Sequence, residues 1–84
     1  MTEQERTDLD ETRRLATIAR VGLAAGRPLS LDLVGTLVHA IHFHAEYVNR
    51  GWAEELGKQL LQGNQKVGHH LDTLIQVITR DLAA

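Results

Sequence analysis

Residues 31–50, LDLVGTLVHAIHFHAEYVNR, constrain the fold most, because too much of this segment is apolar for a helix of a small monomer. At about 100° per residue, one helical stripe holds Val34, Leu37, Val38, Ile41, Ala45 and Val48. A second stripe beside it widens the apolar arc to about 220° and holds Leu33, Ala40, Phe43, His44 and Tyr47. A helix of this kind has to be covered by its own chain or by a partner.

The chain offers little cover, because it has only 84 residues and is expected to form one small domain. Domains of this size bury only about 60–65% of the surface that the unfolded chain exposes, so self-association would add stability. The hydrophobic content of 43% argues against wholesale disorder. The sequence has no cysteine, which excludes disulfides and thiolate metal sites and is consistent with a cytoplasmic protein.

Charge and hydropathy argue against two further classes of function. The formal net charge of −2 gives no bulk attraction to nucleic acid or to anionic lipid. No stretch approaches the roughly 18 apolar residues that a membrane span needs. The acidic, polar N-terminal residues contain no apolar run of the kind found in signal peptides. We therefore expect neither a membrane nor a nucleic acid as the partner.

Helix signals dominate the N-terminal half. Residues 1–7 are polar and are expected to form a frayed tail, which leaves residues 8–84 as a single helical domain. Asp8 followed by Glu11 resembles a capping box and predicts a first helix over residues 9–25. The predicted buried face of this helix holds Leu15, Ile18, Ala19, Gly22 and Ala25.

Two turn signals predict where this helix ends and the next begins. Gly26 and Pro28 should stop the first helix, because glycine accepts the left-handed conformation and proline cannot continue a helix. Ser30 is a good N-cap for a second helix, which is expected to run to about Asn49.

The C-terminal half carries one continuous apolar stripe with steps of three and four residues, formed by Trp52, Leu56, Leu60, Gly63, Val67, Leu71, Leu74, Ile78 and Leu82. It is compatible with one long helix or with two. We favour a break at Gly63-Asn64, because glycine is a natural C′ residue and asparagine a natural N-cap. The predicted fold is all-α, a small bundle of three or four helices, and we expect it to form a homodimer.

Histidine is the residue type here that could carry chemistry. His39, His42 and Glu46 fall on one helical strip and are chemically reasonable zinc ligands, but a glutamate directly after the first histidine is missing. A solvated polar strip explains the same three residues. His44 borders the apolar arc, as a histidine of a core or an interface would. His69 and His70 are adjacent, so on a helix their rings should not face each other, and His69 could reach Asp72 instead.

Catalysis and DNA binding both lack a supporting pattern. The sequence has no cysteine, one serine that is better explained as a cap, and no glycine-rich phosphate loop, so we predict no enzymatic activity and no cofactor. A helix-turn-helix with Gly63 in the turn would place His69 and Asp72 at apolar packing positions. The densest basic region, around Arg13-Arg14, is diluted by neighbouring carboxylates. A histidine-based metal-binding protein and a small DNA-binding regulator stay open as alternatives.

The few aromatic residues favour an interaction protein. Phe43, Tyr47 and Trp52 lie within ten positions of one another, and aromatics of this kind dominate binding hot spots. The alternative is that all three fill the core of the bundle. We predict a protein partner bound by Leu33, Ala40, Phe43, His44, Tyr47 and Trp52.

In size, lack of cysteine and helical character, the chain resembles the small antiactivators that bind quorum-sensing transcription regulators of the LuxR type. The resemblance implies a small helical dimer that occupies an activator and keeps it from DNA. No residue is carried over, because no motif aligns. A toxin-neutralising or phage-type inhibitor is the other interaction protein that the sequence allows.

Overall fold

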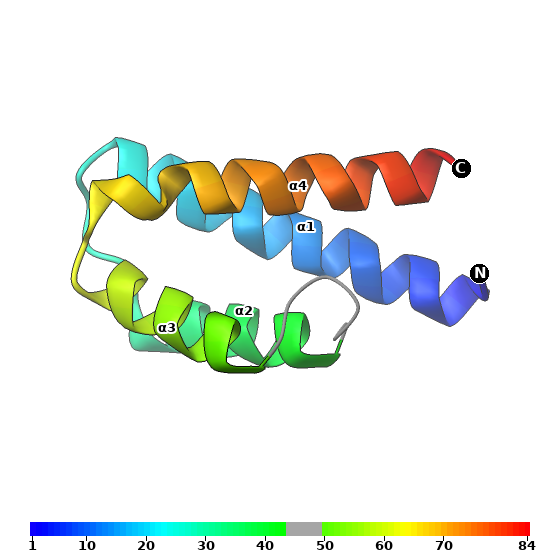
Figure 1. Ribbon diagram of the computed structural model, residues 1–84, viewed down its shortest axis with the longest axis horizontal. Coiled ribbons are helices and arrows are strands. Elements are labelled where there is room, and N and C mark those ends of the chain that lie inside the picture. Colours follow the sequence, from blue (N-terminus) through cyan, green and yellow to red (C-terminus); the bar gives the residue numbers. More distant parts are fainter. Residues whose placement is uncertain (44–49) are drawn as a thin grey trace.

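The computed structural model describes residues 1–43 and 50–84, and every secondary-structure element in them is a helix (Figure 1). The described elements are α1 (Glu3–Ala24), α2 (Leu31–Phe43), α3 (Arg50–Leu61), the short 3-10 helix η1 (Gln65–Val67) and α4 (Gly68–Ala83). In Figure 1, α4 lies along α1, and α2 and α3 run together below this pair, with α2 packed against both α1 and α3. The predicted all-α bundle is confirmed, with four α-helices in the described residues.

The start of α1 differs from the prediction. The helix begins at Glu3, and Thr2 is its N-cap, because the Thr2 hydroxyl accepts a hydrogen bond from the Glu5 N–H at 3.1 Å. Asp8, the predicted N-cap, lies inside the helix, and residues 3–7, predicted as part of a frayed tail, are helical. Thr2 and Glu5 have the spacing of a capping box, a signal that the prediction missed because no apolar residue follows it at once.

Both predicted helix stops are confirmed as Schellman turns. After α1, the Arg27 N–H donates to the Gly22 carbonyl at 3.0 Å, and Gly26 has φ +69°. After α3, the Asn64 N–H donates to the Gln59 carbonyl at 3.0 Å, and Gly63 also has φ +69°. A side chain at this positive φ is strained, so glycine is the residue that each turn requires.

Side-chain caps set the next two helix starts. Ser30 Oγ accepts from the Leu33 N–H at 3.0 Å, so α2 begins where the sequence predicts. Asn64 Oδ1 accepts from the Lys66 N–H at 3.0 Å and caps η1, which leads directly into α4. The break at Gly63-Asn64 is therefore confirmed, with a single 3-10 turn between the two helices. The predicted end of the second helix near Asn49 lies outside the described residues.

The apolar stripes meet in one core to which all four described α-helices contribute. Its buried side chains are Leu9, Leu15, Ala16, Ala19, Leu23, Val34, Leu37, Ile41, Ala53, Leu56, Leu60, Val67, Leu71, Leu74 and Ile78. Full burial of one such Leu or Ile contributes about 1.5–3 kcal/mol. In the first predicted stripe, Val34, Leu37 and Ile41 are buried and Val38 is half-buried, while Ala45 and Val48 lie outside the described residues. The long C-terminal stripe faces the core as its spacing predicts, with Trp52 and Leu82 half-buried and Gly63 exposed in its turn.

The buried face of α1 is rotated from the predicted one. Leu15, Ala19 and Gly22 are buried as expected, but Ile18 and Ala25 are exposed. The core instead takes Leu9, Thr12, Ala16 and Leu23. Thr12 can be buried because its hydroxyl donates to the Asp8 carbonyl at 2.9 Å.

Candidate interaction surface

The second apolar stripe of α2 is only partly covered by the bundle. Leu33 is half-buried and packs against the core, and Ala40 is half-buried as well. The side chain of Phe43 and all of His44 and Tyr47 lie outside what the structure describes. The structure therefore places two of the residues predicted to bind a partner, Leu33 and Ala40, in half-buried positions. For Phe43, His44 and Tyr47 a binding role stays a prediction from the sequence.

Trp52 lies near the start of α3, half-buried, and packs against the core. Its ring meets the ring of His70 on α4 edge-on, with centroids 5.7 Å apart and planes at 88°. Trp52 thus reaches from α3 to α4 and packs against the core, which agrees with the core-filling alternative for this residue.

A further apolar site lies on α1, where the sequence predicted none. Ile18 and Val21 are 43% and 54% exposed, and they stand one helical turn apart. Leu15, Ala16, Ala19 and Leu23 already fill the buried face of α1. Counting them against the width of that face would have indicated that Ile18 and Val21 lie outside it. Other large apolar side chains exposed on the described surface are Met1, Leu31 and Leu61.

The two Schellman turns lie at the same end of the bundle and enclose a shallow cavity of about 260 Å³. Its walls are Leu23, Gly26, Arg27, Pro28, Leu29, Leu60, Leu61, Gln62, Gly63 and Gln65. Gln65 Nε2 donates to the Leu23 carbonyl at 2.7 Å and so joins the end of α1 to the turn before α4. The Leu23 carbonyl also accepts from the Gly26 N–H at 3.1 Å, so it receives two hydrogen bonds at the end of α1.

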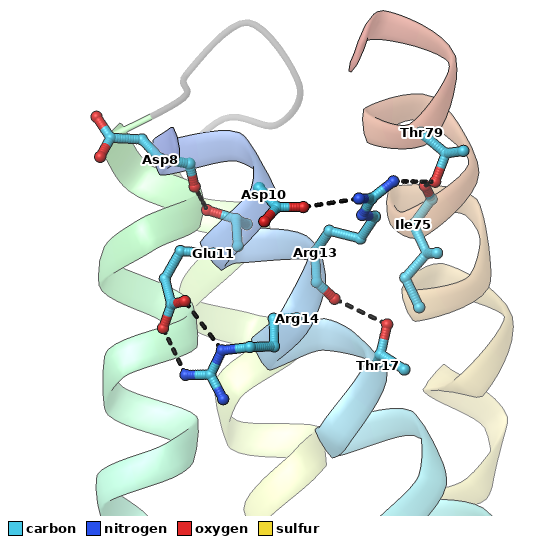
Figure 2. Close-up of polar contacts among 9 residues, drawn as sticks. Asp8, Asp10, Glu11, Arg13, Arg14, Thr17, Ile75 and Thr79 are labelled. Atoms are coloured by element: carbon cyan, nitrogen blue, oxygen red, sulfur yellow. Dashed lines mark hydrogen bonds and ion pairs between the residues drawn. The ribbon is translucent and has the colours of Figure 1, made fainter. Parts of the chain in front are cut away.

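Two neighbouring arginines of α1, Arg13 and Arg14, are paired with carboxylates of the same helix, as Figure 2 shows. Arg14 donates to both carboxylate oxygens of Glu11, at 2.6 and 2.9 Å. Arg13 donates to Asp10 at 2.6 Å and to Thr79 of α4 at 3.4 Å. The hydrogen bonds from Arg14 lower the pKa of the Glu11 carboxyl and raise the pKa of Arg14 itself. This side of α1 is a paired polar surface, with its positive charges already matched.

The histidines are arranged differently from the prediction. His39 is exposed on α2, while the side chain of His42 and all of Glu46 lie outside the described residues. In the part of the chain that is described, no three His, Cys, Asp or Glu side chains come together as metal ligands.

His69 and His70 do face each other, contrary to the prediction. Their ring centroids are 3.9 Å apart, with the planes tilted by 40°. His69 does not pair with Asp72, because Asp72 accepts from Arg20 of α1 at 3.0 Å. The Nδ1 of His69 instead lies 2.6 Å from the Lys66 carbonyl.

No known protein family, curated protein or solved structure matches this chain. Among the described residues, no helix is both long enough and apolar enough to cross a membrane. A function therefore has to be inferred from the chain's own residues.

Proposed function

We propose that the protein is a small regulatory protein that works by binding another protein and has no enzymatic activity. The observation that carries this proposal is the exposed pair Ile18 and Val21 on α1. Apolar residues one turn apart on a helix are the anchors with which helices occupy hydrophobic grooves. Covering them would contribute about 25 cal/mol for each Å² of apolar surface removed from water.

We propose that the second apolar stripe of α2 and the start of α3 also take part in binding. Leu33, Ala40 and Trp52 are all half-buried there. Phe43, His44 and Tyr47 belong to the proposed surface on the strength of the sequence pattern alone. Aromatic anchors supply most of the binding energy in many interfaces, because they bury a large area with few rotatable bonds.

The specific form of the proposal is sequestration of a transcription activator by a homodimer. It is supported by the small size, the lack of cysteine and the helical fold, which the chain shares with the antiactivators of quorum-sensing regulators. Homodimers are the commonest assemblies of small proteins, and a self-complementary apolar patch is what their two-fold symmetry requires.

The test compares two variants that add the same negative charge to different helices. Val21→Glu places a carboxylate in the apolar patch of α1, whereas Gln76→Glu places one on an exposed position of α4. If the patch binds a partner, Val21→Glu captures at least tenfold less of that partner from native lysate, and Gln76→Glu captures as much as the wild type. Circular dichroism should show equal helix content in all three proteins.

Phe43→Glu tests the α2 part of the surface in the same assay. Loss of capture with intact helicity supports a binding role for Phe43, while loss of helicity would make Phe43 a core residue. Equal capture by all variants contradicts the proposed surface. Light scattering at tens of micromolar protein measures the molar mass in solution. A mass equal to that of the monomer would contradict the proposed homodimer.

A further inference from the structure

The cavity between the two Schellman turns exists because each turn requires a glycine. Gly26 and Gly63 both line the cavity, and a Cβ added to either one would meet no atom within 4 Å. The turns therefore leave an open space of about 260 Å³ beside the backbone. In Figure 1 this space lies at the end of the bundle opposite the two chain termini.

The walls of the cavity are mainly apolar and reach the core of the bundle. Leu23 and Leu60 line the cavity and are buried in the core, whereas Leu61 is 48% exposed. Pro28 and Leu29 complete the apolar walls. An apolar side chain that enters the cavity would therefore contact leucines that the bundle already holds in place.

The polar surroundings of the cavity are positively charged. Among its described lining residues, Arg27 is the only charged one, and it is exposed. Lys58 lies one helical turn before Gln62, whose N–H donates to the Lys58 carbonyl, and Lys66 follows Gln65. None of the ion pairs found among the described residues involves Arg27, Lys58 or Lys66. The positive charges of these three side chains are therefore available to a partner.

Carboxylates are scarce at this end of the bundle. Residues 26–32 and 58–70 contain three lysines and arginines but only one carboxylate, that of Asp32. In contrast, residues 1–11 contain five carboxylates and one arginine. The helix dipoles largely offset one another, because α1 and α3 end at the cavity while α2 and η1 begin beside it. A chain with a net charge of −2 thus has an excess of positive charge where the cavity opens.

We propose that this cavity binds an acidic segment of a partner protein, which inserts one large apolar side chain into it. Cavities that enclose a whole drug-sized ligand have about 300–1,000 Å³, so this smaller and shallow one is better suited to a single side chain. A carboxylate beside the inserted side chain can accept two hydrogen bonds from the Arg27 guanidinium. Lys58 and Lys66 attract the segment over a longer distance. The site is separate from the apolar patch of α1 and does not depend on it.

The experiment follows the amide signals of Gly26 and Gly63 by NMR while the protein is titrated with short peptides. The first peptide carries aspartates on both sides of one phenylalanine. In the second peptide alanine replaces the phenylalanine, and in the third lysines replace the aspartates. The first peptide should shift both signals, and the other two should bind at least about tenfold more weakly, since each lacks the charge or the apolar anchor. High salt should weaken binding of the first peptide, because exposed charges are screened.

Two protein variants test the cavity itself. Arg27→Gln removes the charge beside the cavity, and Leu61→Ser removes an exposed apolar wall. Each should weaken binding of the first peptide at least about fivefold. Arg6→Gln and Leu31→Ser make the same changes at exposed positions that do not line the cavity, and both should bind like the wild type. Circular dichroism should show equal helix content in all five proteins.

The three peptides decide the proposal with the wild-type protein alone. Equal binding of the aspartate and lysine peptides overturns it, as does equal binding of the phenylalanine and alanine peptides. The absence of a shift at Gly26 and Gly63 with millimolar peptide also overturns it. N-acetylphenylalanine is the small-molecule probe, and if it binds as tightly as the first peptide, the cavity takes a free carboxylate and not a protein segment. Capture from lysate by Val21→Glu tests the apolar patch of α1 instead, so the two proposals can fail separately.

Discussion

Arg20 of α1 donates from Nε to Asp72 of α4 at 3.0 Å, and this ion pair between residues 52 positions apart joins the two helices. The guanidinium lies directly over Gly68, where an added Cβ would come within 3.0 Å of Cζ. The side chain of Arg20 therefore fills the space that a glycine leaves at the start of α4. Both partners are about one-third to one-half exposed, at 34% and 48%.

This exposure predicts a small electrostatic contribution from the Arg20–Asp72 pair. In a double-mutant cycle with Arg20→Met and Asp72→Asn, the coupling energy should be less than about 1 kcal/mol and should decrease in high salt. Urea titrations of the wild type, the two single variants and the double variant measure the four free energies of unfolding that the cycle needs. A salt-independent coupling of several kcal/mol would show that the pair is desolvated, contrary to its exposure.

Gly57 marks the closest approach between α2 and α3. A Cβ at this position would lie 2.7 Å from Cγ2 of Val38, whose branched side chain is stiff. Gly57→Ala should destabilise the protein by about 1 kcal/mol, because overpacking outweighs the gain in helix propensity. Gly35→Ala is the matched control, since Gly35 is exposed inside α2 and an added Cβ would meet no atom within 4 Å.

Gly35→Ala should stabilise the protein by about 0.5–1 kcal/mol. Urea titrations of the two variants therefore give free-energy changes of opposite sign. If both variants were stabilised, the contact between α2 and α3 would be looser than the structure shows.

Position 63 requires glycine because of its backbone conformation and not because of crowding: its φ of +69° is strained for a residue with a Cβ. Gly63→Ala should cost roughly 1–2 kcal/mol, although no atom lies within 4 Å of the added methyl group. Thermal unfolding beside Gly35→Ala separates backbone strain from crowding, since neither alanine meets a neighbour. An unchanged midpoint in Gly63→Ala would contradict the Schellman turn after α3.

The pKa of the Glu11 carboxyl should lie below its ordinary value of 4.5, because Arg14 donates two hydrogen bonds to the ionised form. A pKa that is lower in the folded state means that the pair adds stability above the unfolded pKa, which is lost as the pH falls through the folded pKa. Carboxyl titration by NMR measures the shift directly. In Arg14→Gln the pKa of Glu11 should return toward 4.5, and an unmoved titration would exclude Arg14 as the cause.

Local signals in the sequence predicted the turns and caps of this fold well. Gly26, Ser30, Gly63 and Asn64 do what their residue types favour, because each interaction is made within a few positions along the chain. The prediction was wrong at Thr2, where the capping pattern precedes a purely polar turn. The Thr2 cap depends on a hydrogen bond alone, and a search for apolar spacing does not detect it.

Contacts between helices could not be predicted in this way. His69 does not reach Asp72, because Arg20 arrives from another helix and takes the carboxylate. Ile18 is exposed, because small residues at Ala16 and Ala19 turn a neighbouring face of α1 inward. Periodicity defines an apolar arc, and the partner helices decide which part of the arc is covered.

The packing of α1 along α4 has a consequence for biosynthesis. While the ribosome is still adding residues 68–83, the apolar side chains of α1 lack the helix that covers them in the native bundle. The nascent chain must therefore keep Leu15, Leu23 and their neighbours partly hydrated, or shielded by a chaperone, until α4 emerges. α1 and α2 can form and pack early, but the core closes only when α4 is available to cover α1.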